Sequence, residues 1–261
     1  MIVIKFGGHA MTDENGAFAQ AISEAVASGV SAVVVHGGGP QIGEALKNAG
    51  IESHFVGGFR VTSQETFNVV EQVLAHEVGP SVAASLCAHG VDAVALSGRD
   101  EQMLTATPLT SLVDGTPADL GLVGVVTSVN PSKIQALVDS GKIPVISPLA
   151  SDVSGQVGYN VNADLAAAAI AGALDAQWLI IMTDVEGIYR QWPNKDSLIS
   201  SICAEELESL KSTFAEGMAP KVQACLDAIS AGAKAVRIID GTNPSALKSA
   251  LLGKGGTLVV A

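Results

Sequence analysis

The stretch that decides the fold is Ile2-Val3-Ile4-Lys5-Phe6-Gly7-Gly8, a short apolar run that ends in a lysine and two glycines. A similar stretch, Ala32-Val33-Val34-Val35-His36-Gly37-Gly38-Gly39, follows it. Each apolar run predicts a buried strand, and the residues after each run predict a helix that packs on the sheet. Because ligands bind beyond the carboxyl ends of parallel strands, the two glycine clusters are expected at a binding edge.

Glycine at these strand ends lets backbone N–H groups come close to an anion, since no Cβ stands in the way. The N-termini of the helices that follow also favour negative charge. The alternative interpretation is a pair of tight strand-to-helix turns that bind nothing. Two clusters at neighbouring strand ends, with Lys5 beside the first, favour a phosphate cradle over that alternative.

Two common nucleotide fingerprints are absent from the chain. No GxGxxG follows the first strand, so a dinucleotide-binding fold is unsupported. Gly141-Lys142 and Gly253-Lys254 are not followed by Ser or Thr, so neither completes a P-loop. A phosphate site in this chain is therefore expected to be of another type.

The rest of the chain alternates strand and helix signals. Strands are expected at 91–96, 143–147, 177–182, 235–240 and 257–260, short β segments at 103–129, and helices at 15–28, 64–88, 131–140, 162–174, 220–231 and 244–251. A hairpin is expected at 53–62, and Gly79-Pro80 could break the long helix. This alternation predicts an open, mainly parallel sheet with helices on both faces, and a soft boundary near residue 175.

Composition narrows the function classes. A net charge of −12 over 261 residues argues against nucleic acid and anionic membranes as partners. No apolar run reaches the roughly 20 residues that span a bilayer, and the first residues do not form a signal peptide, so a cytoplasmic location is expected. Cys87, Cys203 and Cys225 are few and far apart, which predicts reduced, buried thiols and no zinc site.

Two lysines are candidates for a phosphate site. Lys5 ends an apolar strand, so its ammonium group either reaches solvent or meets an anion. Lys221 follows Gly217-Met218-Ala219-Pro220, which predicts a loop and the start of a helix. A cation in the first turn of a helix is unfavourable, and a bound anion would explain it. Taken singly, each lysine could instead be solvated.

The segment Tyr159-Asn160-Val161-Asn162-Ala163-Asp164 leads into an alanine-rich helix. Asn162 could simply be its N-cap, and Asp164 a complement to its dipole. The functional interpretation gives Asn160 a role in substrate binding and Asp164 a role in orienting cations. Arg60, beside the hairpin glycines, could hold a carboxylate through two hydrogen bonds or could be solvated.

Taken together, the chain resembles the amino acid kinase family. The motifs that carry the resemblance occur in the family's order and cover nearly the whole chain: Lys5-Phe6-Gly7-Gly8, His36-Gly37-Gly38-Gly39-Pro40-Gln41-Ile42, Gly58-Phe59-Arg60-Val61-Thr62, Leu96-Ser97-Gly98-Arg99-Asp100, Tyr159-Asn160-Val161-Asn162-Ala163-Asp164, Thr183-Asp184-Val185-Glu186-Gly187-Ile188 and Gly217-Met218-Ala219-Pro220-Lys221. The first motif alone would also fit aspartate kinases. The others narrow the resemblance to members that phosphorylate N-acetyl-L-glutamate in arginine biosynthesis.

The resemblance implies a three-layer αβα sandwich around the open, mainly parallel sheet. Residues 1–175 would bind N-acetyl-L-glutamate and form a homodimer, and residues 176–261 would bind ATP, with Mg²⁺ held through the nucleotide and no metal site in the protein. By motif match, the resemblance implies that the catalytic residues are Lys5, Lys221 and Asp164, and that the backbone of Gly7, Gly8, Gly38 and Gly39 binds phosphate. It also implies that the substrate is bound by Gly38, Gly39, Arg60 and Asn160. The residues implied for ATP binding are Thr183, Asp184, Gly187, Gly217, Met218 and Lys221. His36 is expected to be structural, because a carboxylate acceptor is already ionised and requires no general base.

The chain departs from the family pattern at two places. Glu101-Gln102 stands where members commonly have glycines, and Glu77-Val78-Gly79-Pro80 replaces a Lys-Val-Asn type of segment. The chain also starts at its first strand, without the N-terminal helix of the hexameric, arginine-inhibited members. A homodimer without arginine feedback is therefore expected.

Two other functions remain open at this level. One is the phosphorylation of aminoadipate carried on an acidic protein, which would require a basic docking face; the net charge of −12 argues against it. The other is a catalytically silent nucleotide or amino-acid sensor of the same fold. The presence of Lys5, Lys221 and Asp164 favours a kinase over a sensor.

Overall fold

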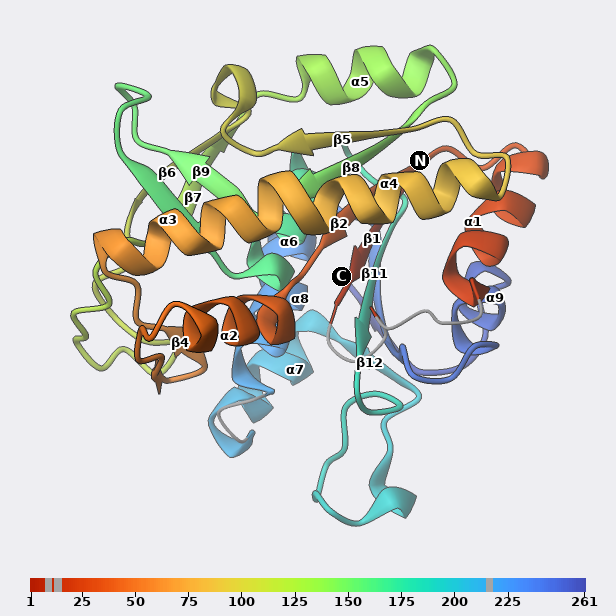
Figure 1. Cartoon of the computed structure of the whole chain (residues 1–261). Helices are drawn as coiled ribbons and strands as arrows, with labels where there is room; N and C mark the ends of the chain where they lie inside the picture. The colour runs from red at the N-terminus through yellow and green to blue at the C-terminus, as the bar shows by residue number, and fades with distance from the viewer. Residues whose placement is uncertain (8–10, 12–15, 215–217) are drawn as a thin grey trace.

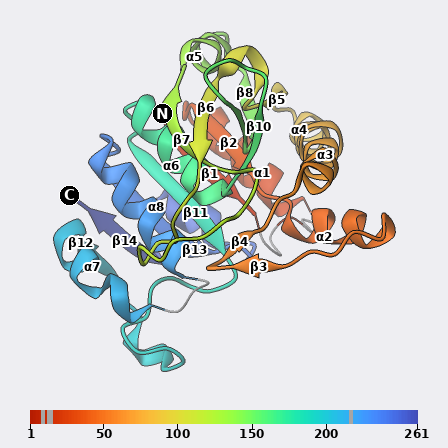
Figure 2. The same cartoon turned by 90° about the vertical axis from the view of Figure 1, so that its left-hand side faces the viewer.

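The computed structural model describes residues 1–7, 11, 16–214 and 218–261. A sheet of eight strands runs through the molecule in the order β12-β14-β13-β11-β1-β2-β8-β5, and helices cover both of its faces (Figures 1 and 2). Its strands are β1 (Ile2–Phe6), β2 (Ala32–His36), β5 (Ala93–Ser97), β8 (Ile143–Ser147), β11 (Trp178–Thr183), β12 (Ser201–Cys203), β13 (Ala235–Asp240) and β14 (Thr257–Val260). All neighbouring strands are parallel except β13 and β14. The predicted three-layer α/β class is confirmed.

Strand alternation divides the core between the two faces of the sheet. Ile2 and Ile4 belong to one hydrophobic cluster, while Val3 belongs to the other. Successive side chains of a strand point to opposite faces, which explains this division. The first face is covered by α1 (Ala17–Ala27), α2 (Gly39–Asn48), α3 (Gln64–Val73), α4 (Gly79–Ala88) and α9 (Ala246–Leu251), and the second by α5 (Ser132–Asp139), α6 (Ala163–Ala173), α7 (Ala204–Leu210) and α8 (Ala219–Ser230).

Two smaller β structures lie beside this sheet. The hairpin expected at 53–62 is present as β3 (Phe55–Val56) and β4 (Phe59–Arg60). The short β segments expected at 103–129 are β6 (Leu104–Pro108) and β7 (Val123–Val129), which close on β9 (Leu149–Ser151) and β10 (Gly158–Val161). β10 leads directly into α6, so this small closed sheet fixes where α6 begins.

The long helix expected at 64–88 does not break at Gly79-Pro80. A π-helical turn, Leu74–Val78, joins α3 to α4, and the Gly79 N–H donates to the Leu74 carbonyl across that wider turn. Pro80 lies in the first turn of α4, where its missing N–H costs little. A single π-type turn inside an α-helix commonly accompanies a functional site.

Other parts of the chain differ from the sequence-based expectations. The sequence pattern did not predict β12 or α7. β12 is only three residues long and has a single buried side chain, which is too little to give a periodic signal. Cys225 is buried as expected, but Cys87 and Cys203 are exposed, so the expectation of buried thiols is wrong for those two. Across the described residues, no helix is both long and apolar enough to cross a membrane.

Helices α6 and α8 pack closely because small side chains face each other. A Cβ placed on Gly172 of α6 would overlap the Cβ of Ala231 at the end of α8. We expect Gly172→Ala to lower the free energy of unfolding by about 1–3 kcal/mol, because overpacking forces these helices apart. Urea denaturation measures the change, and combining Gly172→Ala with Ala231→Gly should restore part of the loss.

Gly43 in α2 is a matched control, since a Cβ there would meet nothing within 4 Å. We expect Gly43→Ala to leave stability unchanged or to raise it by up to about 1 kcal/mol, because alanine loses less backbone entropy on folding. Equal effects of the two glycine substitutions would contradict the close approach of α6 and α8.

Candidate active site

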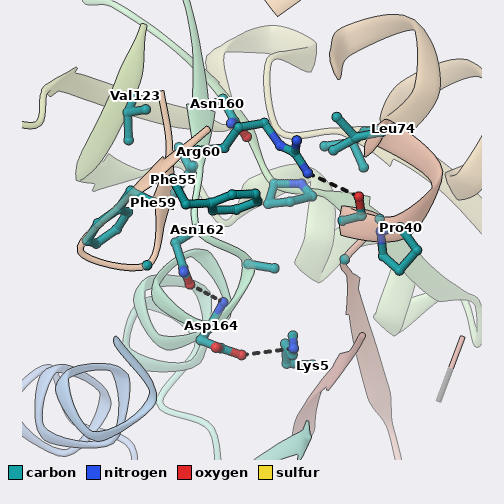
Figure 3. A pocket seen from close by; sticks show the side chains of 18 of the residues that line it. Lys5, Pro40, Phe55, Phe59, Arg60, Leu74, Val123, Asn160, Asn162 and Asp164 are labelled. Carbon is teal, nitrogen blue, oxygen red and sulfur yellow. Dashed lines mark hydrogen bonds and ion pairs between the residues drawn. The ribbon is translucent and has the colours of Figure 1, made fainter. Parts of the chain in front are cut away.

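A buried carboxylate lies between two lysines from different elements. Lys5 Nζ is 3.1 Å from Asp164 Oδ1, and Lys221 Nζ is 3.3 Å from Asp164 Oδ2 (Figure 3 shows the first of these ion pairs). Alternation along β1 points Lys5 to the same face as Val3, which is the face covered by α6. Lys221 belongs to α8, which packs on α6. The fold thus brings together the three residues expected to be catalytic.

Asn162 fixes the position of this carboxylate. Its side-chain oxygen accepts hydrogen bonds from the backbone N–H groups of Asp164, at 2.9 Å, and Leu165, at 3.3 Å. Asn162 is therefore the N-cap of α6, as one of the two sequence interpretations proposed. The cap places Asp164 in the first helical turn, where a negative charge is also stabilised by the helix dipole.

The two lysines keep Asp164 ionised in spite of its burial. Burial alone would raise the pKa of this carboxyl group, but the positive charges of Lys5 and Lys221 outweigh that effect and lower its pKa below the usual value. Lys5 Nζ also donates to the Met182 carbonyl at 3.3 Å, at the end of β11. The ammonium group is consequently held at the carboxyl ends of both β1 and β11.

A pocket of about 270 Å³ opens above this cluster. The predicted substrate-binding residues Gly38, Gly39, Arg60 and Asn160 all line it. Among the described residues, its charged lining is made of three cations, Lys5, Arg60 and Lys221, and one carboxylate, that of Asp164. The pocket therefore carries an excess of positive charge in a protein whose net charge is −12, which suits an anionic ligand.

Arg60 is held over the glycine cluster by the hairpin. Its guanidinium group donates to the Gly39 carbonyl at 3.1 Å and to the Ser53 hydroxyl, and it lies 4.6 Å from the centre of the Phe55 ring (Figure 3). Asn160 donates to the Thr62 hydroxyl at 3.2 Å. These contacts link the hairpin that carries Arg60 to the strand that carries Asn160.

The two glycine clusters lie side by side, as expected. A Cβ on Gly37 would come within 3.3 Å of the Gly7 Cα, and one on Gly7 would come within 2.6 Å of Lys5 Nζ. Glycine at this position therefore leaves the space that the Lys5 side chain occupies where it meets Asp164. Gly8 lies outside the described residues.

Most of the predicted ATP-binding residues lie outside this pocket. Of the members of that set that the structure describes, only Lys221 lines it. Thr183 ends β11 beside the carboxyl end of β1, and a Cβ on Gly187 would overlap the Thr257 hydroxyl. Met218 precedes α8, whereas Gly217 lies outside the described residues. Thr183 thus ends, and Asp184 follows, a strand that ends at the same edge of the sheet as Lys5.

The sequence reasoning missed the apolar wall of the pocket. Phe55 and Phe59 come from the hairpin, Leu74 from the π-helical turn and Val123 from β7. Phe55 and Phe59, which stand close to Arg60 in the sequence, could have indicated this apolar wall. Nothing local distinguishes Leu74 or Val123 from core residues, because only the tertiary fold turns them toward the pocket.

Within the residues that the structure describes, no three His, Cys, Asp or Glu side chains group together in a way that could hold a metal ion.

Comparison with known proteins identifies relatives along nearly the whole chain. An acetylglutamate kinase of Corynebacterium urealyticum is 46% identical over 258 residues, which cover 98% of this chain and 84% of the relative. An acetylglutamate kinase of Nocardia farcinica is 47% identical over 263 residues, which cover 99% of this chain and 86% of the relative.

Solved structures share the fold. A Streptococcus mutans protein, smu.665, superposes with a TM-score of 0.83 at 29% identity and covers 100% of this chain and 98% of its own. An N-acetylglutamate synthase from Neisseria gonorrhoeae, solved with coenzyme A and N-acetyl-glutamate, gives a TM-score of 0.84 at 25% identity; the match covers 100% of this chain but 59% of the synthase.

The fold and the site define an α/β protein with a positively charged pocket at the carboxyl edge of its sheet. A sequence model described as the amino acid kinase family matches residues 1–240. The chain therefore belongs to the amino acid kinase family.

We expect Asp164→Asn to lower the free energy of unfolding by about 3–5 kcal/mol at pH 7, because the substitution leaves the buried Lys5 ammonium without its counter-charge. The folded-state pKa of Asp164 lies below its unfolded value, so its contribution is present above the unfolded value and is lost as the pH falls through the folded pKa. Urea denaturation at pH 7 and in acid, below about pH 4, measures both effects.

Asp139→Asn, at an exposed position in α5, is the matched control and should change stability by less than about 0.5 kcal/mol. A difference between Asp164→Asn and the unmodified protein that grows in acid would contradict the lowered pKa of Asp164.

Proposed function

We propose that the protein transfers the γ-phosphoryl group of ATP to the side-chain carboxylate of N-acetyl-L-glutamate, a step of arginine biosynthesis. The observation that carries the proposal is the buried Asp164 carboxylate paired with Lys5 and Lys221 beneath a positively charged pocket. The relatives described above are named acetylglutamate kinase and match the chain over nearly its whole length, which supports the choice of substrate.

In this reaction a carboxylate oxygen of the acceptor forms a bond to the γ-phosphorus, and the bond from that phosphorus to the β–γ bridging oxygen breaks. The products are N-acetyl-L-glutamyl 5-phosphate and ADP. Negative charge spreads over the phosphoryl oxygens during transfer, so catalysis depends on positioning and on fixed positive charge. Lys5 and Lys221 supply that charge, and Asp164 holds both ammonium groups in place.

In this proposal, residues of the N-terminal part of the chain bind the acceptor. Arg60 forms hydrogen bonds to the carboxylate at the amino-acid end, and Asn160 binds beside it. The backbone N–H groups of Gly8, Gly38 and Gly39 hold the phosphoryl oxygens, with Gly7 leaving room for Lys5. Residues 1–175 thus bind N-acetyl-L-glutamate in this proposal.

Residues 176–261, the C-terminal part of the chain, bind ATP in this proposal. The nucleotide contacts Thr183, Asp184, Gly187, Gly217 and Met218, and its terminal phosphate reaches Lys221. Mg²⁺ enters with the nucleotide, since this ion usually keeps several waters and is held by substrate phosphates. The cytoplasmic location expected from the sequence stays a prediction.

Hydroxylamine trapping tests the proposed reaction directly. Incubation with ATP, Mg²⁺ and N-acetyl-L-glutamate should give an acyl phosphate that hydroxylamine converts to a hydroxamate, which is detected as its coloured complex with ferric ion. We expect Lys5→Met and Lys221→Met each to lower kcat by about 10²–10³-fold, because each removes a charge that stabilises the transition state. Lys248→Met, at a 61% exposed lysine of α9, is the matched control and should retain activity.

The substrate panel decides among the alternatives. Hydroxamate formation with carrier-linked aminoadipate, and not with N-acetyl-L-glutamate, would replace the proposed substrate. Bound ATP with no hydroxamate from any acceptor in a panel that also includes glutamate and aspartate would indicate a sensor. Unchanged turnover in both lysine variants would contradict the proposed chemistry.

We also propose that the protein is a homodimer. β5 forms one edge of the eight-stranded sheet, and its residues Ala93, Val94 and Ala95 are only half-buried. Exposed sheet edges are usually covered, and a second copy of the chain could cover this one. Light scattering should give twice the 26.4 kDa mass of one chain; a monomer or a hexamer would contradict the proposal.

A further inference from the structure

His36 ends β2 on the opposite face of the sheet from Lys5. Its neighbour Val34 faces the cluster packed under α3 and α4, and the alternation of the strand points His36 the same way. The ring is completely buried, and its Nδ1 lies 2.7 Å from the Gly37 carbonyl oxygen.

The contact with Gly37 determines which ring nitrogen carries the proton. A carbonyl oxygen can only accept a hydrogen bond, so Nδ1 carries the hydrogen and donates it. Nε2 then bears a lone pair, and among the described residues it has no hydrogen-bond partner. An unpaired buried nitrogen destabilises the fold, so packing alone does not explain a histidine at position 36.

The Gly37 carbonyl and the Gly38 N–H belong to one planar trans peptide, in which the two groups point in opposite directions. A hydrogen bond that holds the carbonyl toward the buried ring therefore turns the N–H away from it. Gly38 lines the pocket above Lys5. The Gly38 N–H therefore points away from the buried ring, on a residue that lines the pocket.

We propose that His36 is a positioning residue for phosphoryl transfer, which fixes the Gly37–Gly38 peptide so that the Gly38 N–H points at the phosphoryl oxygens. This inference rests on the proposed function. His36 touches no substrate; it acts through the backbone of the glycine cluster.

The π-helical turn supports the same peptide from the same side. A Cβ on Gly79 would come within 3.1 Å of His36 Nε2, so only glycine leaves the ring its space without rearrangement. The Leu74 side chain fills the space where Gly38 would carry a Cβ. His36 and Leu74 together hold the glycine cluster against the pocket.

Burial keeps the ring neutral. It lowers the pKa of His36 to about 4, and this effect outweighs the hydrogen bond to Gly37, which raises the pKa. A neutral ring has one N–H, which the Gly37 carbonyl occupies. His36 accordingly has no proton to exchange with a substrate near neutral pH.

Three substitutions separate positioning from packing. His36→Asn keeps an N–H donor at the place of Nδ1, His36→Gln moves the amide to the place of Nε2, and His36→Leu removes both nitrogens. We expect kcat in the hydroxamate assay to fall about 10- to 100-fold in the Leu and Gln variants, with KM for both substrates little changed. The Asn variant should stay within about 3-fold of the unmodified enzyme.

Stability should not follow activity in this series. His36→Leu removes the unpaired nitrogen but also the donor to the Gly37 carbonyl, so the two effects oppose each other and its urea midpoint should change little even as its kcat falls. His89→Leu is the matched control, because the exposed His89 also places Nδ1 2.8 Å from a backbone carbonyl, that of Ser85, and should retain kcat.

Full activity in His36→Leu would overturn the inference, as would an Asn variant that is folded but as slow as the Leu variant. Nitrogen-15 NMR of the unmodified protein gives a readout that needs no turnover: His36 should be the Nδ1–H tautomer, and the Gly38 amide should shift when the Mg²⁺ complex of AMP-PNP binds. The opposite tautomer, or an unresponsive Gly38 amide, would overturn the inference. Absence of hydroxamate from the unmodified enzyme would instead defeat the proposed function.

Discussion

The ion cluster of Asp164 with Lys5 and Lys221 is the constraint on which the site depends. A carboxylate buried this deeply is unfavourable unless cations compensate it, and the two lysines come from a strand and from a helix far apart in the sequence. The charges can meet only if β1, α6 and α8 are fixed relative to one another. The same cluster that would assist phosphoryl transfer therefore also specifies how the halves of the chain pack.

Small residues allow β1, α6 and α8 to pack closely enough for these charges to form ion pairs. The alanine-rich α6 is buried against the sheet on one side and against α8 on the other, and Gly172 allows α8 to come close at Ala231. A larger side chain would separate the helices and move Lys221 away from Asp164. On β1, Gly7 similarly leaves the space that the Lys5 side chain crosses. Packing and electrostatics are thus coupled at the same few positions.

Side chains on both faces of the sheet contribute to the site. Lys5 points toward α6, whereas His36 on the neighbouring strand points toward the helices of the other face. The glycine clusters lie between these two side chains at the carboxyl edge. One side chain would supply charge to the phosphoryl group, and the other would orient the backbone that binds it. This division follows from strand alternation alone, because the two residues stand at adjacent register positions on parallel strands.

By itself the sequence determined the alternation of strands and helices, the paired glycine clusters and the family motifs, because period and glycine placement are local signals. It left open whether Lys5, Lys221 and Arg60 are solvated, whether Asn162 is a cap, and how the helix passes Gly79. Only the tertiary structure decided these points: it paired both lysines with Asp164, turned Leu74 into the pocket and, among the described residues, left His36 with one bonded nitrogen. Such contacts join residues distant in sequence, and no local pattern encodes which faces will meet.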